Sequence, residues 1–512
     1  MKKKFSRRDF LKLMGILPLS AVGSQFIPST SMKQAGGSQN VIIIVFDAFS
    51  TYNISLYGYQ RETTPNLARL AERAVVYHNH YSGGNFTTPG TSSLLTGTLP
   101  WKHRAFSHYE DLDDRYISNN IFSAFHNYYR LAYTHNPWVT KILKQVKEYL
   151  DENPKRNSLY LKNDFIIPTL FENDEDIAFV SWLRTMRRSD NGYAYSLFMA
   201  SLYERYDKQV EAKFERIKKQ YPQGLPALSD GNYFLLETAI DWFDKKIHSL
   251  PQPFLSYLHL FPPHDPYNTH REFFGRFKDD GLAIEPKPKD SLQYIIDEKS
   301  NHELKHRMKY DEFILYVDRE FGRLFDYLNN SGLLDNTWLI LTSDHGEMFE
   351  RGVVGHTTPL LYEPIIRVPL MIFEPGRKER LDIHTPTSVV DVLPTLLHVT
   401  GQKPAAWNEG MVLPPYASVS LGEDRSIYVL EARNNKKYAP LNIATTALIK
   451  GQYKLTYFFG YDELSGKGRI ELYDIKTDPE EMNNLYDVKK ETAGEMLHDL
   501  RKKLEEVNKP YI

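Results

Sequence analysis

Residues 41–46 read VIIIVF, an unbroken run of β-branched and aromatic side chains. A strand that is apolar on both faces is typical of a parallel sheet covered by helices on each side. Similar runs follow at residues 254–261 (FLSYLHLF), 338–342 (WLILT) and 368–373. Helical patterns lie near residues 233–250, 304–330 and 389–400, and another begins at Thr64 and Pro65. Strands that alternate with helices predict a doubly wound α/β fold with a mixed, mostly parallel sheet.

The pattern changes after about residue 416. Shorter strand-like pieces follow at residues 426–430, 444–449, 453–458 and 470–473, and a charged helix is expected near residues 491–507. These predict a small antiparallel α+β subdomain over residues 417–512. Residues 104–230 show no clean period, and we expect a helical insertion there over one rim of the sheet. The remaining divisions are a signal and linker over residues 1–35 and a large α/β domain over residues 36–416.

Composition excludes several kinds of function. The 512 residues carry 63 basic and 65 acidic side chains, a net charge of −2 with both signs mixed. This balance gives no electrostatic footprint for nucleic acid, so we expect no nucleic-acid partner. The chain has no cysteine, which excludes disulfides, thiolate metal sites and cysteine nucleophiles. Any catalysis must use oxygen and nitrogen groups.

The N-terminus has the pattern of a targeting signal. Residues 6–12 read SRRDFLK and precede a weakly apolar run that Pro18 interrupts, which is a poor membrane span. The string resembles the twin-arginine export signal of bacteria. It implies an encounter with the twin-arginine export machinery and an extracytoplasmic location, periplasmic, secreted or anchored by the signal. No clear cleavage site follows, so membrane contact is expected only through an uncleaved signal.

Polar side chains follow three of the predicted strands. Asp47 comes directly after the first run, Asp344 and His345 come two residues after WLILT, and His264 follows FLSYLHLF. Each has an ordinary alternative as a helix cap or turn residue. Because ligands of open α/β sheets lie beyond the carboxyl ends of the strands, we expect these four side chains to meet there.

A glycine-rich segment supplies a candidate nucleophile. Residues 83–97 read GGNFTTPGTSSLLTG, and Pro89 suits the first turn of a helix. Thr87 would lie at that helix N-terminus, where unpaired amides and the helix dipole attract anions. A threonine cap is the alternative. Since a free threonine hydroxyl is a weak nucleophile, catalysis would require an adjacent metal ion or base.

These motifs together resemble the sulfatase family of the alkaline-phosphatase-like superfamily. FTTPGTSSLLTGTLP is similar to the segment around the sulfatase nucleophile, TSDHGE at residues 342–347 to its second metal motif, and YLHLFPPHDPY to the segment with its substrate histidine. The segments YEPIIRVPLMI, SVVDVLPTLLHVTG and LYDIKTDPEEMNNL resemble later landmarks. The resemblance extends from Val41 to about Asp487 and implies the alkaline-phosphatase-like fold.

The departures from that family are informative. Thr87 occupies the position of the Cys or Ser that sulfatases convert to formylglycine, and a secondary alcohol cannot be oxidised to an aldehyde. The family's arginine is replaced by Thr91, the second of its paired aspartates by Ala48, and a frequent asparagine by His345. Threonine with an Asp–His pair instead resembles the phosphoryl branch, which includes phosphoethanolamine and phosphoglycerol transferases.

We therefore expect one divalent metal ion held by Asp47, Thr87, Asp344 and His345. Three oxygens and one nitrogen favour Zn or Mn over Mg or Ca. Thr87 would attack the substrate and form a covalent intermediate. By resemblance, His264 would protonate the leaving group.

Three further residues, by the same resemblance, would contact the substrate anion: Asn85, His356 and Lys454. For His356 a loop histidine that caps the next strand is an equal alternative, and for Lys454 a solvated strand lysine is the simpler one.

The sequence thus predicts an exported, metal-dependent hydrolase of phosphate monoesters or diesters, with sulfate esters as a further option. Its substrate would be a small-molecule, glycan or lipid ester. One alternative is a transferase that passes the phosphoryl group to a sugar or lipid hydroxyl. Another is a catalytically inactive anion-binding protein, although such a protein would not need the Thr87 hydroxyl.

Overall fold

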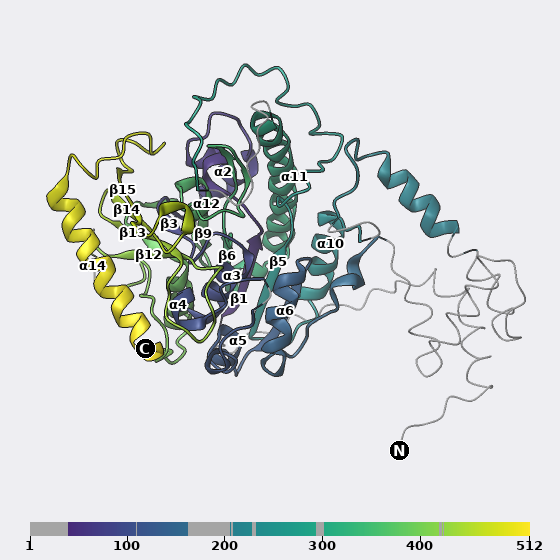
Figure 1. Ribbon diagram of the computed structural model, residues 1–512. Helices are drawn as coiled ribbons and strands as arrows, with labels where there is room; N and C mark the ends of the chain where they lie inside the picture. The colour runs from purple at the N-terminus through teal and green to yellow at the C-terminus, as the bar shows by residue number, and fades with distance from the viewer. Residues whose placement is uncertain are drawn as a thin grey trace, which may run out of the picture. The chain divides into compact units, whose positions relative to one another are not determined.

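Seven strands form the central sheet, in the order β10-β2-β9-β6-β1-β5-β4. Its middle strands β9, β6, β1 and β5 are labelled in Figure 1. The computed structural model of the protein describes residues 39–108, 110–161, 205, 208–227, 232–292, 302–418, 422 and 424–512. The strands are β1 (Asn40–Phe46), β2 (Val75–Tyr77), β4 (Tyr129–Thr134), β5 (Phe254–Leu260), β6 (Thr337–Thr342), β9 (Leu370–Phe373) and β10 (Leu381–Ile383). Strand β9 is antiparallel to both β6 and β2, whereas the other neighbours are parallel.

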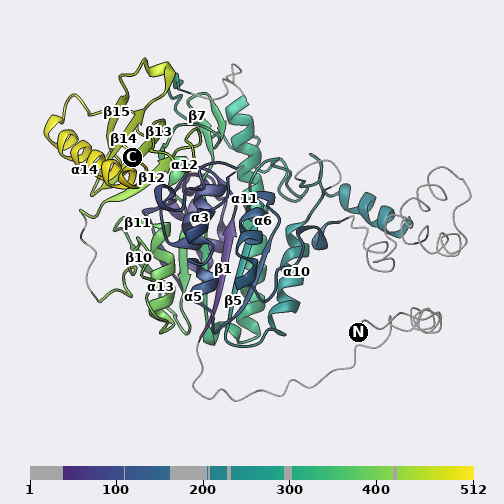
Figure 2. The same ribbon diagram turned by 60° about the horizontal axis from the view of Figure 1, so that its bottom comes forward.

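Helices cover both faces of this sheet (Figure 2). One face packs against α2 (Pro65–Ala71), α10 (Leu236–Ile247) and α11 (His302–Asn330). The opposite face packs against α3 (Thr87–Thr96), α4 (Pro100–His103), α5 (Ile121–Ala124), α6 (Pro137–Gln145) and α13 (Val392–Val399). The doubly wound, mostly parallel α/β fold is therefore confirmed.

The alternation along β1 explains its continuous apolar sequence. Ile42 and Ile44 pack on the side of α11, and Val41, Ile43 and Val45 pack on the side of α3. All five side chains are fully buried. Successive side chains of a strand point to opposite faces, so a strand in the middle of a two-sided sandwich must be apolar at every position.

The C-terminal region forms a second sheet, as the sequence predicts. Its antiparallel strands are β12 (Ile427–Glu431), β13 (Ala444–Lys450), β14 (Tyr453–Phe459) and β15 (Arg469–Asp474). Helix α14 (Lys490–Asn508) packs against β13 and β14. Shorter elements are β3 (His80–Tyr81), β7 (Met348–Glu350), β8 (Val353–Gly355), β11 (Thr387–Ser388) and α12 (Glu363–Ile366).

One expectation needs correction. The stretch 104–230 contains β4, a strand of the central sheet, and is not a purely helical insertion. This edge strand, YRLAYT, is half-buried at its first two residues and so lacks a continuous apolar run. Residues 162–204 and the export signal over residues 1–35 lie outside the described residues, so the extracytoplasmic location and the domain boundaries stay predictions. Among the helices that the structure does describe, none has both the length and the apolar character of a membrane span.

Candidate active site

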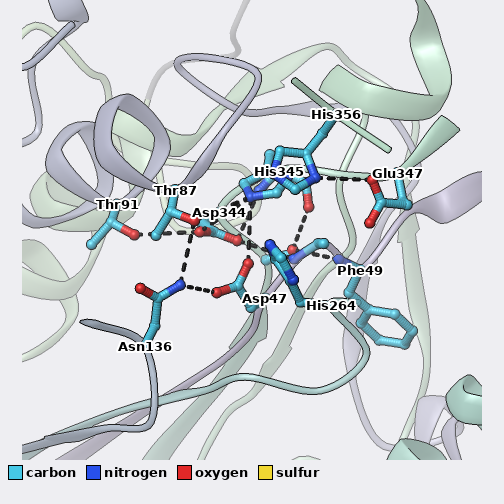
Figure 3. A network of polar contacts seen from close by, with 12 residues as sticks. Asp47, Phe49, Thr87, Thr91, Asn136, His264, Asp344, His345, Glu347 and His356 are labelled. Carbon is cyan, nitrogen blue, oxygen red and sulfur yellow. Dashed lines mark hydrogen bonds and ion pairs between the residues drawn. The ribbon is translucent and has the colours of Figure 1, made fainter. Parts of the chain in front are cut away.

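Four predicted residues meet at the carboxyl edge of the sheet (Figure 3). Asp47 follows β1, Asp344 and His345 follow β6, and Thr87 is the first residue of α3. The Nε2 atom of His345 lies 3.4 Å from Asp47 Oδ1, 3.7 Å from Asp344 Oδ2 and 3.4 Å from Thr87 Oγ1. All four side chains are buried. The rule that strand ends converge predicts that Asp47, Asp344 and His345 meet here, whereas Thr87 was predicted from its place at a helix N-terminus.

A close approach of α3 to the end of β6 positions Thr87. A Cβ atom at Gly90 would lie 2.2 Å from the carbonyl oxygen of Asp344, so only glycine lets the helix come this near. Ser82, just before the glycine-rich loop, donates its hydroxyl hydrogen to the same carbonyl. The helix ends at Gly97, which has φ of 67°, the left-handed conformation of a helix C-terminus.

Local hydrogen bonds orient the Asp344–His345 pair. Asp344 Oδ1 accepts from the backbone amides of Ala48, at 3.3 Å, and of His345, at 3.0 Å. Its Oδ2 accepts from the hydroxyl of Thr91 at 3.5 Å. His345 Nδ1 lies 2.8 Å from the carbonyl oxygen of Gly346 and must donate to it. Nε2 is therefore the His345 nitrogen left for the cluster.

Two further members of the cluster, His259 and Asn136, were not predicted from the sequence. His259 lies inside β5, with Nε2 3.3 Å from Asp47 Oδ2 and 3.6 Å from Asp344 Oδ2. Asn136 caps α6 and donates from Nδ2 to Asp47 Oδ2 at 2.5 Å and to Thr87 Oγ1 at 3.4 Å. A histidine within an otherwise apolar run was a usable signal for the first. The second had the N-P dipeptide that begins a helix.

The other two histidines lie beside His345. The His356 ring centre is 4.1 Å from that of His345 and 5.0 Å from that of His264. His356 Nδ1 bonds Glu347 Oε1 at 2.9 Å, whereas His264 Nδ1 is 2.8 Å from Asp265 Oδ1. His264 is partly exposed, and Glu347 is buried. His264 therefore stands on the open side of the cluster.

The remaining predicted anion contacts have other partners. Asn85 Nδ2 donates to the carbonyl oxygens of His356 and Thr358, so it holds the loop that carries His356. Lys454 Nζ is fully buried, donates to Leu361 O at 2.9 Å and pairs with two glutamates, Glu363 and Glu481. The Lys454 ammonium is thus engaged within this ion cluster, and we do not propose it as a substrate contact.

The two aspartates have opposite electrostatic shifts. Burial alone would raise the pKa of the Asp47 carboxyl, but the charge of His264 and the neighbouring imidazoles of His259 and His345 hold its pKa well below the usual range. Burial and the negative charge of Asp47 both raise the pKa of Asp344. One carboxylate is thus firmly charged and the other repelled by it, which is a pattern common at functional sites.

The pKa values of the three histidines are also shifted in opposite directions. Burial lowers the pKa of an imidazole, but in His345 the charges of Asp344 and Asp47 outweigh it and raise the pKa to about 8. In His264, Asp47 and nearby carboxylates outweigh burial and hold the pKa well above the usual value. Burial and the charges of His345 and His264 lower the pKa of His356. Of the three histidines, His264 therefore combines a raised pKa with the greatest exposure.

The donor set fits a divalent cation. Asp47, His259 and Asp344 offer ligand atoms that all lie within 4.8 Å of one another, and the Nε2 of His345 and the Thr87 hydroxyl adjoin them. Asp47 Oδ1 is buried without a hydrogen-bond partner among the described residues, which is a costly state for a carboxylate oxygen. Mixed carboxylate and imidazole donors suit Zn and related ions.

Comparisons with known proteins identify the family. A family model described as Sulfatase matches residues 39–402, and one described as N-sulphoglucosamine sulphohydrolase, C-terminal, matches residues 356–510. Choline-sulfatase of Rhizobium meliloti (strain 1021) is 24% identical over 477 residues, 88% of this chain and 82% of that protein. The multifunctional alkaline phosphatase superfamily protein PehA of Trinickia caryophylli is 23% identical, over 87% and 91%.

The fold is shared with a solved structure as well. The phosphonate monoester hydrolase of Agrobacterium radiobacter has a TM-score of 0.65 at 19% identity, over 93% of this chain and 96% of that one. The model match over most of the chain decides the family. The chain belongs to the sulfatase family and is a hydrolase of ester bonds.

Proposed function

We propose that the protein is a metal-dependent phosphoesterase in which the unmodified Thr87 hydroxyl is the nucleophile. One observation carries the proposal: Thr87 Oγ1, at the start of α3, lies 3.4 Å from both His345 Nε2 and Asn136 Nδ2, beside the Asp47–Asp344 pair. Since threonine cannot become an aldehyde, the hydroxyl oxygen itself must attack. Phosphate monoesters and diesters are the proposed substrates, with sulfate esters as the second choice.

The proposed metal site consists of Asp47, Asp344, His345 and Thr87. When bound there, a divalent cation would lower the pKa of the hydroxyl and neutralise charge on the substrate anion. Asn136 helps to hold the hydroxyl in place, because its amide donates to both Thr87 Oγ1 and Asp47 Oδ2. The N-terminus of α3 adds the positive end of a helix dipole for the anion.

The two half-reactions use Thr87 and His264. With its hydroxyl proton already lost to solvent, Thr87 Oγ1 forms a bond to phosphorus while the bond from phosphorus to the leaving oxygen breaks, and the His264 imidazolium gives its proton to that oxygen. Water then attacks phosphorus, neutral His264 takes a proton from it, and the bond to Thr87 Oγ1 breaks, which restores the deprotonated Thr87 oxygen and the His264 imidazolium. The raised pKa of His264 supports the acid role.

Activity assays test this proposal. We expect Thr87→Ala to lower kcat/KM by about 10³-fold or more with 4-nitrophenyl phosphate, since removing a nucleophile removes the covalent route. Thr87→Ser keeps a hydroxyl and retains measurable activity. Thr88→Val, which changes the neighbouring hydroxyl next to His108, is the matched control and stays within a few-fold of wild type.

Intermediate trapping and a substrate panel complete the test. A rapidly quenched reaction gives a phosphorylated peptide that contains Thr87, detected by mass spectrometry. Phosphate monoester, phosphate diester and sulfate ester are compared under one set of conditions. Full activity of Thr87→Ala, or a preference for the sulfate ester together with no phosphopeptide, would refute the proposed mechanism.

A further inference from the structure

We propose that His259 is a ligand of the cation in this site and that it directs the site toward Zn over Mg and Ca. The proposal rests on the proposed function only in requiring that a divalent cation occupies the cluster. His259 lies within β5, one residue before the strand ends at Leu260. The evidence is the orientation of its ring, its distances to two carboxylates and the nature of its neighbours.

The sheet fixes the position of His259. It pairs in register with Val45 of β1 on one side and Thr134 of β4 on the other, and its side chain is fully buried. Tyr257, two residues earlier, lies on the same face of β5. Its hydroxyl is 2.9 Å from His259 Nδ1. A ring held at one nitrogen by the strand's own tyrosine presents the other nitrogen in a fixed direction.

That other nitrogen faces two carboxylates at once. His259 Nε2 lies 3.3 Å from Asp47 Oδ2 and 3.6 Å from Asp344 Oδ2. One N–H can point along only one of these directions, whereas a cation between the three groups would use the lone pair of Nε2 and an oxygen of each aspartate. Metal-bound histidines usually have the second ring nitrogen hydrogen-bonded, as Tyr257 provides here.

The chemistry of the donors gives the metal preference. With His259, the site has two imidazole nitrogens, from His259 and His345, together with two carboxylates and the Thr87 hydroxyl. Imidazole is a good ligand for Zn, Cu and Ni, whereas Mg and Ca prefer sites made of oxygen. A second nitrogen therefore strengthens binding of Zn far more than binding of Mg.

Calorimetry with metal salts tests the proposal without an activity assay. The full chain is stripped with a chelator and titrated with zinc chloride or magnesium chloride. We expect His259→Ala to weaken zinc binding by about 100-fold or more, and Tyr257→Phe, which removes only the supporting hydroxyl, by about 10-fold. His259→Glu replaces the nitrogen with oxygen, so the ratio of zinc to magnesium affinity falls.

His135→Phe is the matched control. His135 is also a fully buried histidine at this edge, and its amide donates to the His259 carbonyl at 3.3 Å, but its ring stacks on Phe234. We expect its zinc affinity to equal that of wild type. Circular dichroism melting shows that each variant is folded before titration.

Several results would overturn the inference. Wild-type zinc affinity in folded His259→Ala would exclude His259 as a ligand, and an equal loss of zinc and magnesium affinity would exclude its role in selectivity. Failure of the proposed function is distinguishable, because active Thr87→Ala would refute the nucleophile while the zinc titrations of His259 variants keep their meaning. A wild-type chain that binds no zinc would refute the inference and the metal part of the proposed function together.

Discussion

Two buried clusters of charged side chains differ in how their carboxylates are neutralised. At the sheet edge, the ionisable groups that face Asp47 and Asp344 are imidazoles, and their other side-chain partners, the Asn136 amide and the Thr91 hydroxyl, are neutral. In the second cluster, Glu363 and Glu481 surround Lys454, and Arg367 lies 3.7 Å from Glu363. The second cluster contains as many fixed cations as carboxylates. The first does not, and we infer that a bound cation completes it.

This difference shows why burial of a charged residue is a weak guide to function. Lys454 is as deeply buried as Asp47, and both were named as candidate site residues from the sequence. The two residues differ only in their partners. A lysine between two glutamates is neutralised within the protein, whereas two aspartates beside imidazoles require a bound cation. The sequence could not show those partners, since Glu363 and Glu481 are distant from Lys454 along the chain.

The largest effect is expected in the second cluster, around Lys454. Lys454→Met leaves Glu363 and Glu481 buried without their shared cation, so we expect the free energy of unfolding to fall by about 3–5 kcal/mol. Burial and the charge of Glu363 already raise the pKa of Glu481 to about 7, against the opposing effect of Lys454. Urea unfolding measures the loss.

A double variant sharpens this result. Lys454→Met combined with Glu481→Gln removes one charge of each sign, and we expect it to recover most of the lost stability. If Lys454→Met alone unfolds at the wild-type urea concentration, the cluster is not the structural ion network described here.

At the sheet edge, we expect removal of a charge to raise the free energy of unfolding when no metal is present. In chelator-treated protein, Asp344→Asn removes the charge that repels Asp47, so the free energy of unfolding should rise by roughly 2 kcal/mol. With zinc present the order reverses, because wild type gains binding energy and the variant has lost a ligand. Thermal melts with and without zinc measure both. A variant that is less stable than wild type in chelator would contradict the comparison.

Most of the fold could be predicted because buried parallel strands have a distinctive composition. The runs that became β1, β5, β6 and β9 are continuously apolar, and helices α10 and α11 have a clear period. Strand β4 could not be recognised in the same way. It lies at the edge of the sheet, and its first two residues, Tyr129 and Arg130, are half-buried, so its polar residues fit a loop or a helix equally well.

The candidate site was predictable where residues follow the ends of strands. Asp47, Asp344 and His345 were found by that rule alone, and Thr87 by its place at a helix start. His259 was missed because it lies inside β5, where an interior residue is read as core. A strand residue next to the edge can still reach the cluster, since its side chain points along the face that α3 covers.

The smallest effect concerns a third way to bury an ionisable group, which is to keep it neutral. His103 Nδ1 accepts from the Ala105 amide at 3.2 Å, and Nε2 lies 3.1 Å from Ser93 Oγ. Burial lowers its pKa to about 3. The unfolded chain therefore takes up a proton below pH ~6.5 that the folded chain does not. As the pH decreases below this value, His103 therefore lowers the free energy of unfolding by up to about 1.4 kcal/mol per pH unit.

His103→Asn isolates that contribution. The variant keeps an acceptor for the Ala105 amide but has no titratable ring, so we expect it to be about 1 kcal/mol less stable than wild type at neutral pH. As the pH falls below about 6.5, the difference should shrink, because only wild type must keep a proton off a buried imidazole. Urea unfolding at several pH values measures the slope, with His126→Asn at an exposed position as the control. A constant difference across the series would mean that His103 is protonated in the folded protein, and the contrast with the sheet-edge histidines would then disappear.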